Sequence, residues 1–276
     1  MMMHYKKIKP GLFVPLFLTG FCFLFPVSCK TINAAPDVLP PGVVVFSFDD
    51  EPNAHENVTI KLLAVLEKNN IRACFSILGV NADHNPSLVK RIAAGGHRII
   101  NHGYGEKWAV FMDKNAFKAN LLEGERAIYD ALASTDINQS DKKQPALDIP
   151  AYRPHGGFYK KTQQQCWEEE GYKMMPCTIR IHDAVLSEKD KKKALTRIIK
   201  QIEKQNGGII LLHDARDSYT TMETRLAKKP HGKFNRAWIP AFVDEVIIIL
   251  QEKNYRISGF DPFEIPGVLS STRSIP

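Results

Sequence analysis

The sequence predicts an α/β fold in which helices connect parallel strands. Its 276 residues are 44% hydrophobic and 24% charged, which is typical of a globular domain and excludes disordered and collagen-like classes. Between residues 43 and 260, strand-like and helix-like apolar periods alternate. Because strict βα alternation gives parallel strands with right-handed crossovers, the expected architecture is a doubly wound sheet or a barrel.

Short apolar runs bounded by turn residues predict the strands. They are expected at Val43–Phe48, Ala73–Leu78, His97–Asn101, Ala151–Arg153, Lys173–Ile181, Gly208–Leu212 and Tyr255–Ser258. Apolar residues at helical spacing predict the connecting helices. These are expected at Asn57–Lys68, Pro86–Ala94, Lys114–Ala133, Lys161–Gly171, Lys189–Gln205 and Trp238–Lys253.

The first 28 residues are typical of an export signal, because three lysines precede an uncharged apolar stretch from Gly11 to Val27. That stretch is too short and too interrupted by Pro and Gly to predict a membrane span. Its end resembles a lipoprotein signal in which Cys29 becomes the lipidated first residue, and ordinary cleavage near Ala34 or Ala35 is the alternative. We expect an exported protein of the cell envelope, either a membrane-anchored lipoprotein or a periplasmic or secreted protein.

The predicted organisation is a signal segment (1–28), a linker (29–42), one folded domain (43–262) and a C-terminal tail (263–276). The chain has 37 Lys and Arg against 30 Asp and Glu, and loss of the three signal lysines leaves 34 − 30 = +4. This excess is too small and too scattered to predict nucleic-acid binding.

Two stretches, Ser134–Pro150 and Ala215–Ala237, are longer than a connection requires. The second contains six basic residues, which are Arg216, Arg225, Lys228, Lys229, Lys233 and Arg236. Both are interpreted as surface insertions, which folds tolerate well. Contact of the basic stretch with an anionic polymer or a membrane surface is the alternative.

Polar residues directly follow five of the predicted strands. They are Asp49 and Asp50, His102 and Glu106, Arg153 and His155, His182 and Asp183, and His213 and Asp214. The carboxyl ends of parallel strands meet at one edge of a sheet or barrel, which is where such folds place active sites. The sequence therefore predicts an active site built from these strand ends.

A metal ion fits this set of residues. His102 and Glu106 are four residues apart, so a helical turn would place both on one face, where they could bind one ion together. Asp50 is the expected third ligand. Three protein ligands leave open positions for water and a substrate carbonyl, as a hydrolytic metal site requires.

Proton transfer is assigned to other residues. Asp49 is free to act as a base, and Arg153 is expected to keep it ionised and oriented. His213, at another strand end, can donate the proton that a leaving group needs.

The same residues resemble the motifs of the polysaccharide deacetylases, carbohydrate esterases that share the chitooligosaccharide deacetylase homology domain. The resemblance covers about Val43 to Phe260, with five motifs in the order of that family. In this sequence the motifs read VVVFSFDDEP, LVKRIAAGGHRIINHGYGE, YRPHGGFY, TIRIHDA and GGIILLHD. The resemblance implies a distorted (β/α) barrel of about seven parallel strands, a divalent metal ion, and removal of N- or O-acetyl groups from sugars.

Carried over residue by residue, the resemblance implies that Asp49 is the catalytic base and that Arg153 orients it. His213 is the implied acid, with Asp183 as its partner.

For the metal, the resemblance implies Asp50 and His102 as ligands, with Glu106 at the position of the family's second His. The backbone N–H of Gly156 is an implied donor to the oxyanion, and His155 and Leu211 are expected to line the substrate.

The sequence departs from the family's motifs at four positions. Glu106 replaces a metal-binding His, Glu51 replaces Gly, His155 replaces Pro and Ala184 replaces Trp. A site with two carboxylates shifts the metal preference from Zn²⁺ toward the harder ions Mn²⁺ or Mg²⁺. The expected cofactor is a divalent ion, either Zn²⁺, Mn²⁺ or Mg²⁺.

We therefore expect a metal-dependent hydrolase of carbon–nitrogen bonds other than peptide bonds. Its expected substrate is an acetylated amino sugar in a peptidoglycan-like or chitooligosaccharide-like glycan, and the membrane is a partner through the signal segment or a lipid at Cys29. One alternative is a glycan-binding lipoprotein with attenuated catalysis. Another is an amidohydrolase of the same fold that acts on a small non-sugar amide.

Overall fold

The structure is a computed structural model, and it describes residues 29–33, 39–134 and 151–259. The predicted signal segment, the predicted C-terminal tail and nearly all of the first predicted insertion lie outside these residues. Among the described helices, none combines the length and apolar character needed to cross a membrane.

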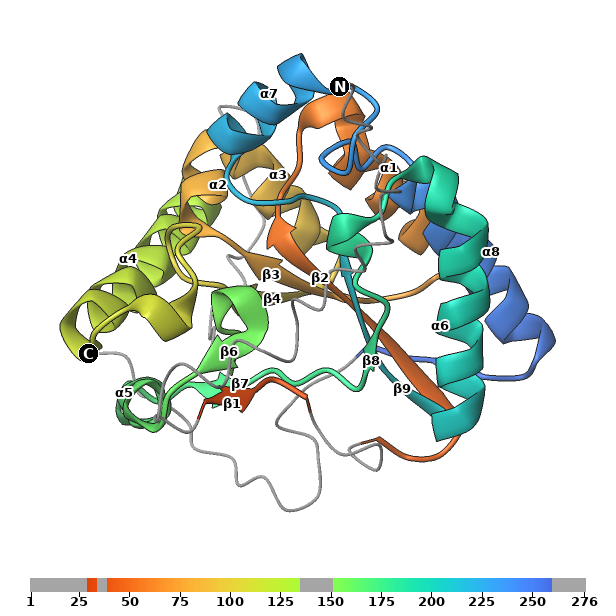
Figure 1. Ribbon diagram of the computed structural model, residues 1–276, viewed down its shortest axis with the longest axis horizontal. Coiled ribbons are helices and arrows are strands. Elements are labelled where there is room, and N and C mark those ends of the chain that lie inside the picture. The colour runs from red at the N-terminus through yellow and green to blue at the C-terminus, as the bar shows by residue number, and fades with distance from the viewer. Residues whose placement is uncertain (1–28, 34–38, 135–150, 260–276) are drawn as a thin grey trace, which may run out of the picture.

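A sheet of parallel strands forms the centre of the molecule and curls into a half-barrel (Figure 1). Its strands are β2 (Val43–Glu51), β3 (Cys74–Ile77), β4 (Arg98–Asn101), β5 (Ala151–Tyr152), β7 (Lys173–Met174), β8 (Ile179–Arg180), β9 (Gly207–His213) and β10 (Arg256–Ile257). They lie in the order β7, β5, β4, β3, β2, β9 and β8, and β10 pairs with the first residues of β2. This arrangement confirms the predicted distorted barrel of about seven parallel strands.

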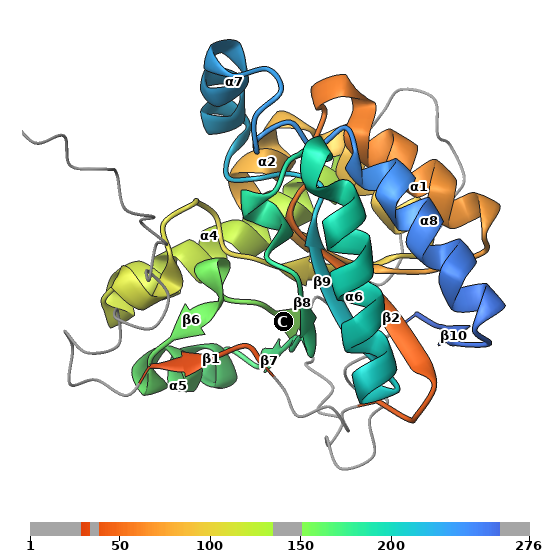
Figure 2. The same ribbon diagram turned by 45° about the vertical axis from the view of Figure 1, so that its right-hand side comes forward.

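Helices cover the outside of the sheet. They are α1 (Val58–Lys68), α2 (Gly79–His84), α3 (Pro86–Ala94), α4 (Lys114–Ala133), α5 (Lys161–Glu169), α6 (Lys191–Gln205), α7 (Tyr219–Lys228) and α8 (Ile239–Glu252). Figures 1 and 2 show α1, α6 and α8 on one side of the molecule and α4 and α5 on the other. A separate antiparallel pair is formed by β1 (Lys30–Thr31) and β6 (Phe158–Tyr159).

Most predicted elements are confirmed, and α3 and α4 have the predicted bounds. The single strand expected at Lys173–Ile181 is wrong, because the segment forms β7 and β8 at opposite ends of the strand order. Pro176 lies between them and has no N–H to donate to a ladder. The stretch 215–237, interpreted as an insertion, contains α7, and α2 was also missed.

β2 positions the site through its alternation of side chains. Every residue of this strand is buried. Phe46 and Phe48 belong to the large apolar core that packs against α1 and α8. Ser47 and Asp49 occupy the alternate positions and contact Arg153 on the other face. The interior face of the half-barrel is therefore polar where β2 ends.

Candidate active site

The end of β2 is bulged, so two successive aspartates reach the same place. Neighbouring residues of a regular strand point to opposite faces. Here Asp50 has a left-handed backbone with φ 72°, and the register with β3 shifts between Asp49 and Glu51. The nearest carboxylate oxygens of Asp49 and Asp50 consequently lie 3.8 and 3.4 Å from His102 Nε2.

Two hydrogen bonds hold this strained strand end in place. Asn81 Nδ2 donates to the Asp50 carbonyl at 2.8 Å, and the Asp217 backbone N–H donates to Asp50 Oδ2 at 3.2 Å. A left-handed non-glycine residue persists only where its surroundings fix it, and such residues concentrate at functional sites.

Asp49 is held by a fully buried arginine. Arg153 Nη1 donates to Asp49 Oδ1 at 2.5 Å. The same guanidinium donates to the carbonyls of Met175 and Pro176 and to Ser47 Oγ, each at 3.1 Å. These four contacts fix the position of the Arg153 guanidinium, whose charge balances that of the Asp49 carboxylate. The structure thus brings together the predicted base and its predicted orienting residue.

Three side chains at this edge form a group that could hold a metal ion. Asp50, His102 and His155 are buried, and one ligand atom from each lies within 4.8 Å of the others. Asp50 Oδ1 is 3.4 Å from the Nε2 atom of each histidine. Two ligands bound to a tetrahedral ion at about 2.1 Å are separated by roughly 3.4 Å. The donor set and its spacing therefore fit a divalent cation.

The polar surroundings support the same fit. His102 Nδ1 lies 2.7 Å from the Arg153 carbonyl, so a proton on Nδ1 makes that bond and leaves the Nε2 lone pair for a ligand. Burial raises the pKa of Asp50, but His102 and His155 outweigh burial and hold it well below its usual range. The group thus presents an ionised carboxylate and an available imidazole nitrogen.

Glu106 lies outside this group, so the structure does not place it as the sequence predicted. Residues 102–106 form no helical turn, because Gly103 has φ 85° and the chain bends away. Glu106 Oε2 instead accepts from the Ser218 backbone N–H at 2.9 Å, and Oε1 accepts from Thr221 Oγ1 at 3.0 Å. Glu106 therefore ties the loop after β4 to the first turn of α7. His155, assigned to substrate from the sequence, occupies the place expected for Glu106.

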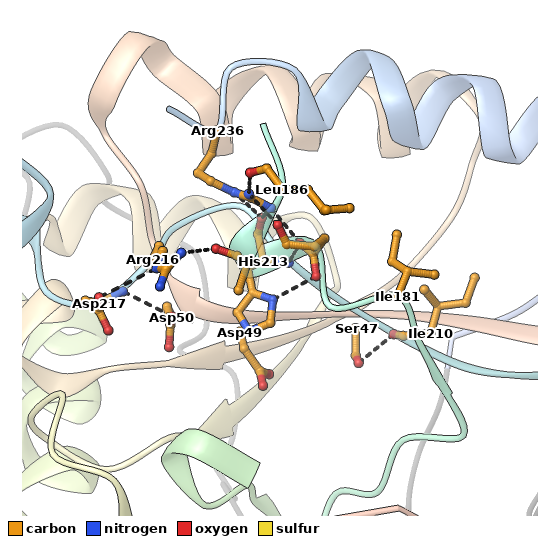
Figure 3. Close-up of polar contacts among 12 residues, drawn as sticks. Ser47, Asp49, Asp50, Ile181, Leu186, Ile210, His213, Arg216, Asp217 and Arg236 are labelled. Carbon is orange, nitrogen blue, oxygen red and sulfur yellow. Dashed lines mark hydrogen bonds and ion pairs between the residues drawn. The ribbon is translucent and has the colours of Figure 1, made fainter. Parts of the chain in front are cut away.

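The predicted acid and its partner are also brought together. Asp49 and His213 are register partners on the adjacent strands β2 and β9, and Figure 3 shows their side chains next to each other. Asp183 Oδ1 lies 3.0 Å from His213 Nδ1, and Asp183 Oδ2 accepts from the His213 backbone N–H at 2.9 Å. Burial lowers the pKa of His213, but the Asp183 carboxylate outweighs burial, so the pKa is raised overall.

Arg236 contacts this pair of residues, a role that the sequence reasoning missed. Its buried guanidinium donates to Asp183 Oδ2 at 2.5 Å and to the carbonyl of His213 at 2.8 Å. It therefore fixes both members of the pair, much as Arg153 fixes Asp49. No motif indicated this role, because Arg236 belongs to the stretch interpreted as an insertion.

The remaining predicted residues are Gly156, which lies in a turn, and Leu211, which lies in the core. Gly156 has φ 80°, and a side chain there would lie 2.6 Å from Trp108 Cγ, so this turn requires glycine. Leu211 is 4% exposed and packs in the aromatic core cluster. Its predicted contact with substrate stays a prediction.

Two further carboxyl groups are buried beside the site. Glu51 is fully buried, and neither of its oxygens has a hydrogen-bond partner among the described residues. Burial and the neighbouring Asp214 raise the pKa of Glu51 well above its usual range. Burial also raises the pKa of Asp214 to about 6. Both carboxyl groups therefore hold a proton to higher pH than exposed carboxyl groups do. Glu51 is the residue that replaces glycine in the first motif.

Comparisons with known proteins agree with the motifs. The family model described as polysaccharide deacetylase matches residues 37–175, just over half of the chain. The chain is similar to a peptidoglycan-N-acetylglucosamine deacetylase of Bacillus cereus, with 23% identity over 186 residues that cover 67% of this chain and 79% of that protein. It is also similar to a chitooligosaccharide deacetylase of Rhizobium leguminosarum bv. trifolii, with 34% identity over 88 residues. That match covers 32% of this chain and 40% of the relative.

Another Bacillus cereus peptidoglycan-N-acetylglucosamine deacetylase is 34% identical over 85 residues, and this chain covers only 30% of its length. Among solved structures, the Bc1960 peptidoglycan N-acetylglucosamine deacetylase has a TM-score of 0.58 and 22% identity, covering 79% of this chain and 85% of that chain. A CE4 family pseudoenzyme of Bacillus anthracis has a TM-score of 0.53 and 15% identity, covering 79% of this chain and 63% of that chain. These two structures share the fold.

The buried acid pair makes stability depend on pH. Carboxyl groups whose pKa is raised by folding contribute stability that is complete below the unfolded pKa and is lost as pH rises through the folded pKa, about 6 for Asp214. Glu51→Gln should therefore raise the free energy of unfolding by about 1–3 kcal/mol at pH 8 and have a smaller effect at pH 5. Urea denaturation at both pH values, with a chelator present, measures the difference.

The matched control is Glu67→Gln, which changes an exposed carboxylate on α1 and should show no such pH dependence. An effect of Glu51→Gln that is the same at pH 5 and pH 8 would contradict the account of the acid pair.

Proposed function

The chain belongs to the polysaccharide deacetylase family, and we propose that it is a metal-dependent hydrolase that removes acetyl groups from acetylated amino sugars of a cell-envelope or extracellular glycan. One observation carries the proposal. Asp49 with its arginine, the Asp50, His102 and His155 group, and the paired His213 all meet where β2 and β9 end. A base, a cation site and an acid at one place are what amide hydrolysis requires.

Asp50, His102 and His155 are the proposed ligands of the cation. A divalent cation held there supplies Lewis acidity, which polarises an acetamide carbonyl and lowers the pKa of a water molecule. Two imidazoles and one carboxylate leave the site at a formal charge of +1. This nitrogen-rich set favours Zn²⁺ over Mn²⁺ and Mg²⁺, in contrast to the set containing Glu106 that the sequence suggested.

Proton transfer belongs to the residues around the cation site. Asp49 takes a proton from the attacking water, and Arg153 holds its carboxylate in position. His213 gives a proton to the departing amine, for which its raised pKa keeps it charged to higher pH. The backbone N–H of Gly156 is proposed as a donor to the oxyanion of the tetrahedral intermediate.

An exposed aromatic surface beside the site supports a sugar substrate. Trp108 is 45% exposed and Phe111 is 48% exposed. The Trp108 ring stacks on Phe111 with centroids 6.0 Å apart and on Phe158 with centroids 6.5 Å apart. Trp108 also lies against Gly156, next to the proposed ligand His155. Flat aromatic faces of this kind pack against the apolar C–H face of a sugar ring, because both surfaces are large and rigid.

We further propose that the protein is exported to the cell envelope, with Cys29 as the lipid-carrying residue. Lys6, Lys7 and Lys9 before the apolar stretch support export, and the short Pro- and Gly-containing stretch supports a cleaved signal. The membrane is then a partner through this anchor. A non-catalytic glycan-binding protein is the alternative that Glu106 suggested. The complete set of Asp50, His102 and His155 favours catalysis instead.

The proposed ligand set predicts which variants lose the metal. His155→Ala should lower Zn²⁺ affinity by at least about a hundredfold, because it removes one of three ligands. Glu106→Gln, which keeps the size of the side chain, should leave affinity within about threefold, since Glu106 contacts α7 rather than the ion. Isothermal calorimetry with Zn²⁺, Mn²⁺ and Mg²⁺ measures both. Loss of binding in Glu106→Gln with binding retained in His155→Ala would return the ligand role to Glu106.

The pair of His213 and Asp183 predicts a change in the pH profile. The acid must be protonated, so kcat should fall as pH rises through the pKa of His213. Asp183→Asn removes the charge that raises this pKa, so the alkaline limb should move to lower pH and the rate should fall. An alkaline limb that stays in place would show that another group limits the reaction at high pH.

Acetate release tests the proposed function directly. The wild-type protein should release acetate from chitooligosaccharides or peptidoglycan glycan strands when a divalent ion is present. Asp49→Asn should lower turnover by about a hundredfold or more, and Asp130→Asn, an exposed carboxylate on α4, serves as the control. Release only from small non-sugar amides would favour the amidohydrolase alternative. No acetate with any of the three ions would contradict the proposal.

A further inference from the structure

Three cationic side chains converge on one aromatic ring beside the site. The guanidinium carbons of Arg216 and Arg225 lie 4.6 and 5.8 Å from the centre of the Phe234 ring, and Lys233 Nζ lies 5.9 Å from it. Arg216 follows β9, Arg225 belongs to α7, and the other two lie in the connection from α7 to α8. We call Arg216, Arg225, Lys233 and Phe234 the basic cluster.

Negative charge acts mainly on Arg216 of the basic cluster, whose guanidinium is attracted by the carboxylates of Asp217, Asp50 and Asp183. Within residues 29–33, 39–134 and 151–259, the only ion pair of these three cations joins Arg216 Nε to Asp217 Oδ2 at 3.8 Å. Arg225 and Lys233 are exposed to solvent. The charge of Arg216, followed by partial burial and the charge of Arg225, lowers the pKa of Lys233. The cations therefore repel one another, and this repulsion would be relieved by a bound anion.

The basic cluster is continuous with the proposed active site. Arg216 donates through Nη1 to the carbonyl of Ala184, the residue after Asp183. Asp217, the residue after Arg216, donates its backbone N–H to Asp50 Oδ2 at 3.2 Å. Figure 3 shows Arg216 and Asp217 next to Asp50 and His213. An anion on the basic cluster would therefore lie next to a substrate whose reacting group is at the proposed site.

We propose that the basic cluster binds a carboxylate carried by the glycan itself, so that the substrate class is an acidic N-acetylated glycan rather than a neutral one. This inference rests on the proposed function and specifies its substrate. Guanidinium groups suit the purpose, because their planar N–H donors match the two oxygens of a carboxylate. The cluster is too small for a nucleic-acid backbone, which requires a longer basic track with interleaved aromatic residues.

The test compares two substrates that differ only in charge. The first is a soluble glycan strand of N-acetylated amino sugars in which alternate sugars carry a lactyl carboxylate. The second is the same strand with its carboxylates converted to neutral amides. We expect wild-type protein to have a kcat/KM about five- to tenfold higher for the acidic strand. Added salt should reduce this preference, because it screens exposed charges.

Variants then test whether the basic cluster causes the preference for the acidic strand. In the double variant Arg225→Gln, Lys233→Gln, the ratio of kcat/KM for the acidic strand to that for the neutral strand should fall toward one. Lys200→Gln removes an exposed lysine from α6 and should preserve the wild-type ratio. If thermal unfolding shows that the double variant is misfolded, Lys233→Gln alone is measured, because its side chain is exposed.

The outcomes separate this inference from the proposed function. Release of acetate from both strands with equal kcat/KM, or a preference that the variants do not change, would overturn the inference and leave the proposed function standing. Release of acetate from neither strand would count against the proposed function as well.

Discussion

The left-handed backbone of Asp50 is the constraint on which the site depends. In a regular strand Asp49 and Asp50 would point to opposite faces, and the proposed base and the proposed metal ligand could not share one site. The bulge at the end of β2 turns both carboxylates toward His102. Hydrogen bonds from Asn81 and Asp217 hold it there, and the loop after β9 thereby becomes part of the site. Up to Asp49, β2 keeps a regular register with β9, and this register places His213 beside Asp49.

The structure links two of the departures from the family's motifs, Glu106 and His155. Glu106 stands where the family has a metal-binding His, and His155 stands where it has Pro. In this fold the imidazole of His155 approaches Asp50 to 3.4 Å, while Glu106 hydrogen-bonds to the start of α7. We therefore propose that the loop after β5, instead of the loop after β4, supplies the second imidazole to the metal site. On this account Glu106 reflects a relocated ligand rather than a decayed site.

The alternation of strand and helix patterns predicted the parallel half-barrel, and polar residues after buried strands predicted where the site lies. The fold prediction is confirmed, and the structure brings the polar residues together at one edge of the sheet. Both patterns depend on burial and connectivity, which the sequence records locally. Glu106 was misplaced because its spacing from His102 was interpreted as helical, whereas Gly103 turns the chain. Arg236 and α7 were missed because their role depends on contacts with distant strands. A contact made only in three dimensions leaves no periodic signal along the chain.

The central claim is that His155 completes the metal site in place of Glu106. Crystals of the wild-type protein grown with Zn²⁺ and measured at the zinc absorption edge test it most directly. The account predicts one anomalous peak at about 2.0–2.2 Å from Asp50 Oδ1, His102 Nε2 and His155 Nε2. It also predicts that the Glu106 carboxylate stays on Ser218 and Thr221. A peak coordinated by Glu106, or a peak that excludes His155, would contradict the account.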